Sequence, residues 1–472
     1  MQSTCRSAIS VLTIGLLPNI SMSIASLFIF MNRPLIHVEY FLVAVCFVIL
    51  PRMLAFSIMI ALFAVDLFVS LAPGFYFELS GLVDALSGIG FLDLSATVLP
   101  LAPAVIGLIF SLLLIHYLEK RITKDRFSGT IQTSMSLLVI LLVFSADYFL
   151  SPNNSNRTTQ SFTKINIGGS ISTILLRSYD ASQSEYPLEF DSIDSATSRL
   201  FSAISNGDDL PKHITLVLAE SLSLYKDNSA NALQLSPLAD NAFIVENFNV
   251  EIGSVLFKGP TISGELRELC GIRFLATIPK PGSLPVSDCL PKKLAEQGYK
   301  SIAVNGFFPS FFSTGRLYSE LGFEEQYFIN DIATALTSPP LCGSTFRAVC
   351  DLDAARKLFT VKKANRDDKI FFYWLTFNGH LPIWEPEDVA PAIDCSASRA
   401  TSKYDSICSS VRTNAFVMKI LATKISEDAQ RHSAYIIVGD HMAPFLRTDI
   451  RAELEAGKVP YIILTPKTDA RH

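Results

Sequence analysis

The sequence predicts a membrane domain of five helices followed by an α/β domain with a mostly parallel central sheet. Long apolar runs fill the first third of the 472-residue chain, and strands alternate with amphipathic helices after residue 211. Residues 1–150 hold 7 Lys and Arg and 8 Asp and Glu, whereas the rest of the chain holds 32 and 36. We therefore expect a transmembrane domain over 1–150, a linker over 151–210 and a globular domain over 211–472.

Five apolar runs make up the expected membrane domain, at roughly 8–31, 35–50, 52–74, 97–118 and 131–150. Most of them approach the roughly 20 residues that a helix needs to cross a bilayer. Buried helices of a soluble core are the alternative, but five such runs in series argue against it. A cleaved signal peptide would account for the first run only.

Basic residues orient these spans, because loops rich in Lys and Arg face the cytoplasm. The largest cluster lies between the fourth and fifth runs and consists of Lys120, Arg121, Lys124 and Arg126. This orientation puts the N-terminus in the cytoplasm and everything after about residue 151 outside the membrane. Arg33 is the one basic residue whose position does not fit this orientation. The net charge of −5 gives no sign of nucleic-acid binding.

Six of the eight cysteines fall in the external domain, at Cys270, Cys289, Cys342, Cys350, Cys395 and Cys408. An even number of cysteines in an exported domain favours disulfides. Their spacing suggests three local pairs, 270–289, 342–350 and 395–408, although six cysteines allow 15 pairings. Metal binding is the alternative, but the sequence has no CxxC motif.

Polar residues follow several of the predicted strands of the external domain. Buried strands are predicted at 214–220, 301–306, 369–377, 434–439 and 461–466, and helices at 290–298, 351–363 and 403–425. Glu220 ends the first strand, His380 follows the third, and Asp440 and His441 follow the fourth. In parallel sheets, sites form at the carboxyl ends of the strands.

Thr261 completes this set, because it begins a predicted helix directly after the turn Gly259-Pro260. Each position also has an ordinary reading: Thr261 as an N-cap, Asp440 as a turn cap and His441 as a loop histidine. Together, however, Glu, Asp and His supply the ligands that a divalent ion such as zinc or manganese prefers. A metal beside Thr261 would lower the pKa of its hydroxyl and make it a nucleophile.

These motifs resemble those of the membrane-anchored branch of the alkaline phosphatase and sulfatase superfamily, which includes phosphoethanolamine transferases of Gram-negative envelopes and lipoteichoic acid synthases. "LVLAESLSLY" and "VGDH" resemble its metal motifs, with Glu220, Asp440 and His441 as ligands. "GPTISGE" resembles the nucleophile motif, with Thr261 also touching the metal, and "NGHLP" the segment with a phosphate-binding histidine, His380. The resemblance implies a sulfatase-like fold, one divalent metal (zinc first, manganese second), and a bacterial inner-membrane protein with a periplasmic catalytic domain.

Two further segments relate the chain to different branches of the superfamily. "SFFSTGRLYSELGF" is similar to a lipoteichoic acid synthase segment that contacts glycerol phosphate, which implies substrate contacts by Phe312 and Arg316 despite a shifted spacing. A plain amphipathic helix is the other reading of that segment. "DCSASRATSKYDSIC" resembles a disulfide loop of the phosphoethanolamine transferases, although the cysteine usual before their nucleophile is missing.

The resemblance implies a transferase that moves phosphoethanolamine from phosphatidylethanolamine to an envelope glycan or lipid-linked glycan through a phosphothreonine intermediate. A phosphoglycerol transferase using phosphatidylglycerol, a membrane-anchored phosphodiesterase and a non-catalytic scaffold are the alternatives. Ser263 is a reserve nucleophile, and Ser221 is expected to pack or to cap a helix. Asp240, Glu265 and Arg267 are candidates for supporting the site, but solvated or structural roles are the expected ones for each.

Overall fold

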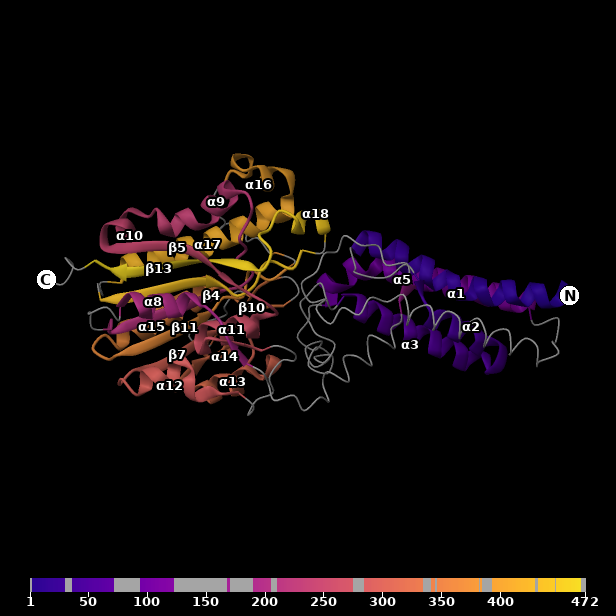
Figure 1. Ribbon diagram of the computed structural model, residues 1–472, viewed down its shortest axis with the longest axis horizontal. Helices are drawn as coiled ribbons and strands as arrows, with labels where there is room; N and C mark the ends of the chain where they lie inside the picture. The colour runs from indigo at the N-terminus through magenta and orange to yellow at the C-terminus, as the bar shows by residue number, and fades with distance from the viewer. Residues whose placement is uncertain are drawn as a thin grey trace. The chain divides into compact units, whose positions relative to one another are not determined.

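The computed structural model of the chain divides into two units, which are described separately (Figure 1). One unit comprises residues 1–80 and 95–184, and the other comprises residues 81–94 and 185–472. The structure describes residues 2–29, 36–71, 94–122, 168–169, 190–204, 210–274, 284–333, 341–343, 346–381, 383, 393–428, 432–445 and 447–467.

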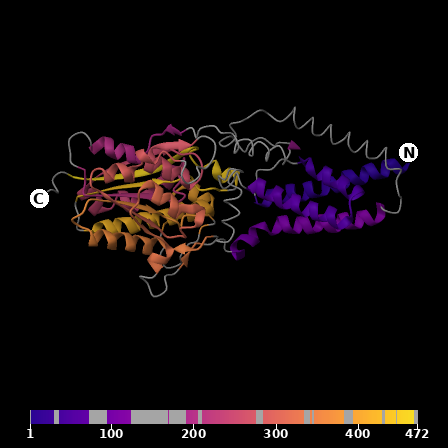
Figure 2. The ribbon, with the colours of Figure 1, turned by 90° about the horizontal axis from the view of Figure 1, so that it is seen from below.

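The first unit is helical, and its helices lie side by side along their length (Figures 1 and 2). They are α1 (Gln2–Ile29), α2 (Glu39–Ile49), α3 (Arg52–Leu71) and α5 (Leu94–Ile122). The strand β1 (Ile36–His37), between α1 and α2, pairs in parallel with β2 (Gly168–Gly169). Helix α5 lies against α1, where the hydroxyls of Ser21 and Ser111 are 2.7 Å apart.

Within the described residues, one helical segment is long and apolar enough to cross a bilayer: Arg52–Ser70 of α3, with a mean hydropathy of 2.3. The apolar segments Leu12–Ala25 and Ala102–Tyr117 are shorter, and the predicted run 131–150 lies outside the described residues. Large apolar side chains nevertheless point outward from α1, α3 and α5, among them Ile24, Ile60, Ile106, Phe110 and Leu113.

The second unit is built on a seven-stranded sheet with the order β5-β13-β12-β4-β11-β7-β8. In that order its strands are Phe248–Leu256, Lys458–Pro466, Ser433–Gly439, His213–Ala219, Ile370–Leu375, Lys300–Asn305 and Glu325–Tyr327. Strands β12, β4, β11, β7 and β8 run parallel, whereas β13 and β5 are antiparallel to their neighbours. The predicted α/β domain with a mostly parallel sheet is therefore confirmed.

Helices cover the sheet on both sides (Figure 2). Their bounds are α8 (Ala196–Ile204), α9 (Asn228–Ala239), α10 (Ala242–Asn247), α11 (Thr261–Cys270), α12 (Leu290–Ala295), α13 (Thr314–Leu321), α14 (Ile329–Ala333), α15 (Asp351–Ala364), α16 (Arg399–Lys403), α17 (Asp405–Glu427) and α18 (Thr448–Arg451). Short strands complete the unit: β3 (Phe190–Ser192), β6 (Ile272–Phe274), β9 (Leu341–Cys342) and β10 (Ala348–Val349). Short 3-10 helices lie at Val286–Asp288, Phe311–Ser313 and Cys395–Ala397.

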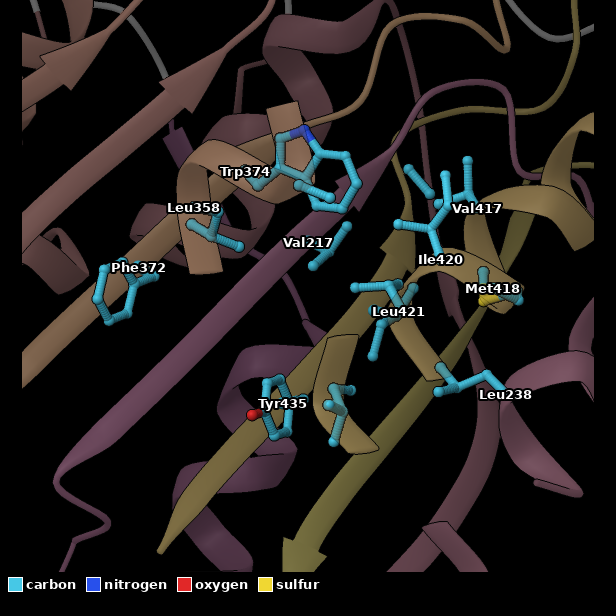
Figure 3. Close-up of a cluster of buried hydrophobic side chains, with 14 of the residues drawn as sticks. Val217, Leu238, Leu358, Phe372, Trp374, Val417, Met418, Ile420, Leu421 and Tyr435 are labelled. Carbon is cyan, nitrogen blue, oxygen red and sulfur yellow. The ribbon is translucent and has the colours of Figure 1, made fainter. Parts of the chain in front are cut away.

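The main core lies between one face of the sheet and helices α9, α10, α15 and α17 (Figure 3). Val217, Phe372, Trp374 and Tyr435 point from the strands toward side chains of α9, α15 and α17. Every residue of β4, β11 and β12 is buried, because helices cover both faces of these central strands. This explains why their sequences are continuously apolar and do not alternate between apolar and polar residues.

Three disulfides close local loops of the second unit within the described residues: Cys270–Cys289, Cys342–Cys350 and Cys395–Cys408. They are the three pairs that the cysteine spacing suggests. Disulfides of this kind suit an oxidising compartment.

The strand register brings the ends of three central strands to one edge of the sheet. Ala219 at the end of β4 pairs with Gly439 at the end of β12, and Leu218 pairs with Leu375 at the end of β11. The residues that follow these strands therefore leave the sheet next to one another.

Ile437→Ala tests the core, because Ile437 is fully buried in β12. We expect the free energy of unfolding to fall by about 2–5 kcal/mol, from lost burial and the cavity left behind. The matched control is Ile252→Ala on the edge strand β5, where the side chain is 53% exposed and the change should stay within about 0.5 kcal/mol. Tryptophan fluorescence during urea denaturation measures both, since the two tryptophans, Trp374 and Trp384, lie in this part of the chain.

Candidate active site

Three metal-ligating side chains converge at this edge of the sheet. One ligand atom from each of Glu220, Asp440 and His441 lies within 4.8 Å of the other two, and all three residues are buried. The Nε2 atom of His441 is 3.6 Å from a Glu220 carboxylate oxygen and 3.3 Å from Oδ2 of Asp440. Glu220 directly follows β4, and Asp440 and His441 directly follow β12.

Thr261 brings a hydroxyl to the same point. Its Oγ1 lies 3.5 Å from Oε2 of Glu220 and 3.4 Å from Nε2 of His441. Pro260 occupies the N-cap position of α11, so Thr261 is the first helical residue and not an N-cap. Its side chain is partly exposed, whereas the Ser263 hydroxyl is buried beside Gly259. The geometry thus favours Thr261 over Ser263 as the group that an outside molecule can reach.

Asp440 uses its two carboxylate oxygens differently. Oδ1 accepts hydrogen bonds from the backbone N–H groups of Ser221, at 2.8 Å, and His441, at 2.6 Å. Oδ2 is buried and has no hydrogen-bond partner among the described residues. Burial and the nearby Glu220 carboxylate raise the pKa of Asp440 to about 7. A buried oxygen of this kind needs a compensating charge, because an unpaired buried carboxylate is costly.

Backbone carbonyls and hydroxyls orient the other two side chains. The Nδ1 atom of His441 lies 3.0 Å from the Met442 carbonyl oxygen, which can only accept, so Nδ1 carries a proton and, in the neutral ring, Nε2 is the nitrogen available to a metal. Burial lowers the pKa of His441, but Asp440 and Glu220 outweigh this effect and raise it overall. The Ser221 hydroxyl donates to Oε1 of Glu220, and the Thr376 hydroxyl accepts from the Glu220 N–H, each at 2.8 Å.

These residues fit a divalent metal ion. Two carboxylates, one imidazole nitrogen and a hydroxyl form a set of oxygen and nitrogen donors that suits zinc or manganese. The partnerless Oδ2 of Asp440 and the His441 tautomer both direct acceptors to one point. A cation there would also offset the repulsion between the Glu220 and Asp440 carboxylates.

The backbone around the site is unusually close-packed. A Cβ atom on Gly264 of α11 would lie 2.9 Å from the Cα atom of Asp440, and one on Gly379 would meet the Glu220 carbonyl oxygen. Ser221 has a φ of 58°, in the region that non-glycine residues rarely adopt. Such strain is retained where the surroundings require it, which is often at functional sites. Ser221 was expected only to pack or to cap a helix, because a positive φ leaves no sequence signal at serine.

His380 lies on the loop that follows β11, next to the backbone of Glu220 through Gly379. Its Nδ1 atom is 3.1 Å from the Leu381 carbonyl oxygen, and its ring contacts Phe346 and Phe377. Burial, with the nearby charge of His441, lowers the pKa of His380 to about 4. The ring is therefore neutral at pH 7 until a negative charge enters the site.

Phe312 and Arg316 are placed differently from the four converging residues. The Arg316 guanidinium is exposed on α13 and forms an ion pair with Glu320, one turn along the helix. Phe312 has a φ of 48°, and its ring contacts Phe311. Neither described contact reaches Thr261 or the metal-ligating residues.

The model of the sulfatase family matches residues 212–471, which is more than half of the chain. The chain belongs to the sulfatase family. The match confirms the superfamily that the motifs resemble and, with it, that the chain is an enzyme. A search of curated proteins finds no match to this chain.

Solved structures match this chain at low sequence identity. The integral membrane lipooligosaccharide phosphoethanolamine transferase A (EptA) from Neisseria meningitidis is 14% identical, with a TM-score of 0.50, and the match covers 92% of this chain and 81% of EptA. The lipoteichoic acid synthase LtaP from Listeria monocytogenes is 14% identical, with a TM-score of 0.38, covering 57% of this chain and 71% of LtaP. The Streptococcus pyogenes phosphoglycerol transferase GacH is 16% identical, with a TM-score of 0.37, and the match covers 58% of this chain and 77% of GacH.

Glu265 anchors the helix that carries Thr261. Its buried Oε1 accepts hydrogen bonds from the hydroxyls of Tyr318, at 2.8 Å, and Tyr373, at 2.9 Å, which join α11 to α13 and β11. Burial raises the pKa of Glu265 to about 7. Asp240, by contrast, is the C-cap residue of α9.

Glu265→Gln gives a pH test of this anchor. Because the folded pKa of about 7 exceeds the usual 4.5, the wild type loses stability as the pH rises from about 4.5 to 7. The glutamine cannot titrate and still accepts from both tyrosines. We therefore expect the variant to gain stability relative to the wild type between pH 5 and pH 7.5, measured by thermal unfolding in EDTA. Exposed Glu296→Gln is the control, and an equal pH trend in both variants would contradict the assignment.

Proposed function

We propose that the protein is a metal-dependent transferase that moves phosphoethanolamine from phosphatidylethanolamine to an envelope glycan or lipid-linked glycan. The observation that carries this proposal is the position of the Thr261 hydroxyl within 3.5 Å of both Glu220 and His441. A partly exposed hydroxyl beside a buried group of metal-ligating side chains is the arrangement that nucleophilic phosphoryl transfer requires.

Glu220, Asp440, His441 and Thr261 would hold one divalent metal. Zinc is the first choice, because imidazole and carboxylate ligands suit it, and manganese is the second. A cation bound there supplies positive charge that lowers the pKa of the Thr261 hydroxyl and stabilises negative charge on phosphoryl oxygens.

The residues of the chain would carry out the transfer in two displacements. Oγ1 of Thr261 forms a bond to the headgroup phosphorus while the bond to diacylglycerol breaks, and the hydroxyl proton ends on the diacylglycerol oxygen. A hydroxyl of the acceptor then displaces the phosphothreonine, and its proton returns to Thr261. The N-terminus of α11, where Thr261 lies, favours the phosphate charge. An anionic phosphodiester would raise the pKa of His380, so that a protonated ring can donate to it.

The first unit supports a lipid donor. Its outward-facing apolar side chains suit a bilayer. We propose that five helices within residues 1–150 span a bacterial inner membrane and that the catalytic domain lies in the periplasm. We also propose that the chain divides into a transmembrane domain over residues 1–150, a linker over 151–210 and a catalytic domain over 211–472. The catalytic site then shares a membrane face with the phospholipid. EptA, whose fold is similar over most of this chain, is named as a phosphoethanolamine transferase.

A phosphoglycerol transferase is the second candidate. The segment 310–323, which includes Phe312 and Arg316, favours it, because an exposed guanidinium next to an aromatic pair could contact a glycerol phosphate headgroup. Both candidates use Thr261 in the same way and differ only in the group that Thr261 would carry.

Thr261→Ala tests the nucleophile. The purified full chain in detergent, with zinc, is incubated with phosphatidylethanolamine or phosphatidylglycerol and analysed by intact mass spectrometry. We expect a phosphoethanolamine adduct on the wild type and none on the variant, with transfer reduced by at least about 10³-fold. Ser263→Ala, which leaves Thr261 in place, is the control and should retain the adduct.

The other outcomes are equally informative. A glycerol phosphate adduct would keep the mechanism and replace the donor. An adduct that persists on Thr261→Ala would eliminate Thr261 as the nucleophile, and release of the headgroup to water without an acceptor product would identify a phosphodiesterase.

Cysteine labelling tests the proposed topology. In a Cys5→Ser, Cys46→Ser background, Lys124→Cys should react with an impermeant maleimide only after the inner membrane is permeabilised, because its basic loop is expected inside. Ser155→Cys should react in intact spheroplasts. Labelling of Lys124→Cys from the outside would rule out the five-span arrangement.

A further inference from the structure

A short segment before the family-matched region packs against the helix that carries Thr261. This segment, the N-terminal arm, is residues 190–204 and consists of β3 and α8. Strand β3 pairs with β6, which directly follows α11, and the Ile193 N–H donates to the Gly271 carbonyl oxygen at 3.0 Å. Helix α8 lies against α11, β12 and β13. The sulfatase match begins at residue 212, so the arm precedes the matched region.

Glu268 of α11 holds the arm through one carboxylate oxygen. Its Oε2 accepts hydrogen bonds from both the N–H, at 3.0 Å, and the hydroxyl, at 2.9 Å, of Thr197. Thr197 lies in the first turn of α8, where unpaired N–H groups and the helix dipole favour a negative charge. Glu268 is 1% exposed, so these bonds are not weakened by solvent.

The other oxygen of the same carboxylate holds Arg267. Oε1 of Glu268 lies 2.6 Å from Nε of Arg267, which is also 1% exposed. The two terminal nitrogens of Arg267 donate to the carbonyl oxygens of Gly439, at 2.6 Å, and Asp440, at 3.3 Å. A continuous path of buried hydrogen bonds therefore runs from Thr197 through Glu268 and Arg267 to the turn that carries Asp440 and His441.

The orientation of Asp440 depends on the backbone that this path reaches. Its Oδ1 is held by two backbone N–H groups, one of which belongs to the same turn, so a shift of the turn would redirect Oδ2. The Arg267 guanidinium presents a planar fork of donors, which fixes two successive carbonyls at once. Groups that orient metal ligands in this indirect way commonly change metal affinity by about 10–100-fold when they are removed.

We propose that Glu268 and Arg267 are positioning residues that couple the N-terminal arm to the metal-binding turn. The inference rests on the proposed function only in that Asp440 and His441 hold the metal. The arm lies within the expected linker 151–210, and its docking on Glu268 aligns the ligands. A buried charge pair that served packing alone would not need to contact both the arm and the ligand turn.

Zinc affinity of the full chain in detergent tests the coupling, with a chromophoric chelator as competitor. We expect Glu268→Gln and Arg267→Met to weaken zinc binding by about 10–100-fold, and Arg267→Lys to recover part of the loss because it can still reach one carbonyl. Thr197→Val keeps the backbone N–H bond but loses the hydroxyl bond, so its loss should be smaller and in the same direction. Ser202→Ala, exposed on the same helix, is the matched control and should bind zinc like the wild type.

Folding is checked separately by thermal unfolding in EDTA. Thr197→Val keeps the test valid if the charge-removing variants fail to fold, since it leaves the Arg267–Glu268 pair intact. Unchanged zinc affinity in folded Thr197→Val and Glu268→Gln would overturn the inference, as would equal losses in Arg267→Lys and Arg267→Met. A wild type that binds neither zinc nor manganese would instead contradict the proposed function, so the two failures are distinguishable.

Discussion

The mutual repulsion of two buried carboxylates is the constraint on which the catalytic unit depends. Glu220 and Asp440 point to one place at the edge of the sheet, where burial and then the charge of Glu220 raise the pKa of Asp440. The surrounding structure restrains both groups and does not separate them. Backbone N–H groups hold one oxygen of Asp440, a hydroxyl holds Glu220, and Arg267 holds the turn behind them. Such an arrangement persists when a cation is part of the design.

Much of the fold could be predicted because the central strands have a simple chemistry. Strands β4, β11 and β12 are buried on both faces, so each is a short, continuously apolar run that differs from the amphipathic helices around it. Strand β5 was not predicted, because it lies at the sheet edge with several exposed residues and its sequence FNVEIGSVL is mixed in character. The antiparallel direction of β13 could not be predicted from its own sequence either, because a buried strand has the same apolar pattern whether it runs parallel or antiparallel to its neighbours.

The site could be predicted only in part, for a related reason. Glu220, Asp440 and His441 stand next to strand ends, and Thr261 follows a Gly-Pro turn, so local sequence indicates all four. The parallel register of β4 and β12 brings Glu220, Asp440 and His441 together, whereas Thr261 reaches them from helix α11. Arg267 was only a candidate for a supporting role, and its partners could not be predicted, because it bonds to a carbonyl group 172 positions away that carries no side-chain signature. Phe312 and Arg316 were assigned from a resemblance with shifted spacing, and their described contacts stay within their own segment.

The close approach of main chains at Gly264, Gly379 and Gly439 has an evolutionary consequence. At each of these positions a side chain would collide with the backbone of Asp440, Glu220 or Leu222, so the ligands are set by contacts between peptide groups. Peptide groups are the same whatever residues flank them. Neighbouring side chains can therefore drift over long divergence without moving the ligands, provided that these glycines persist. A lineage could lose nearly all recognisable identity in this way and still keep its catalytic geometry.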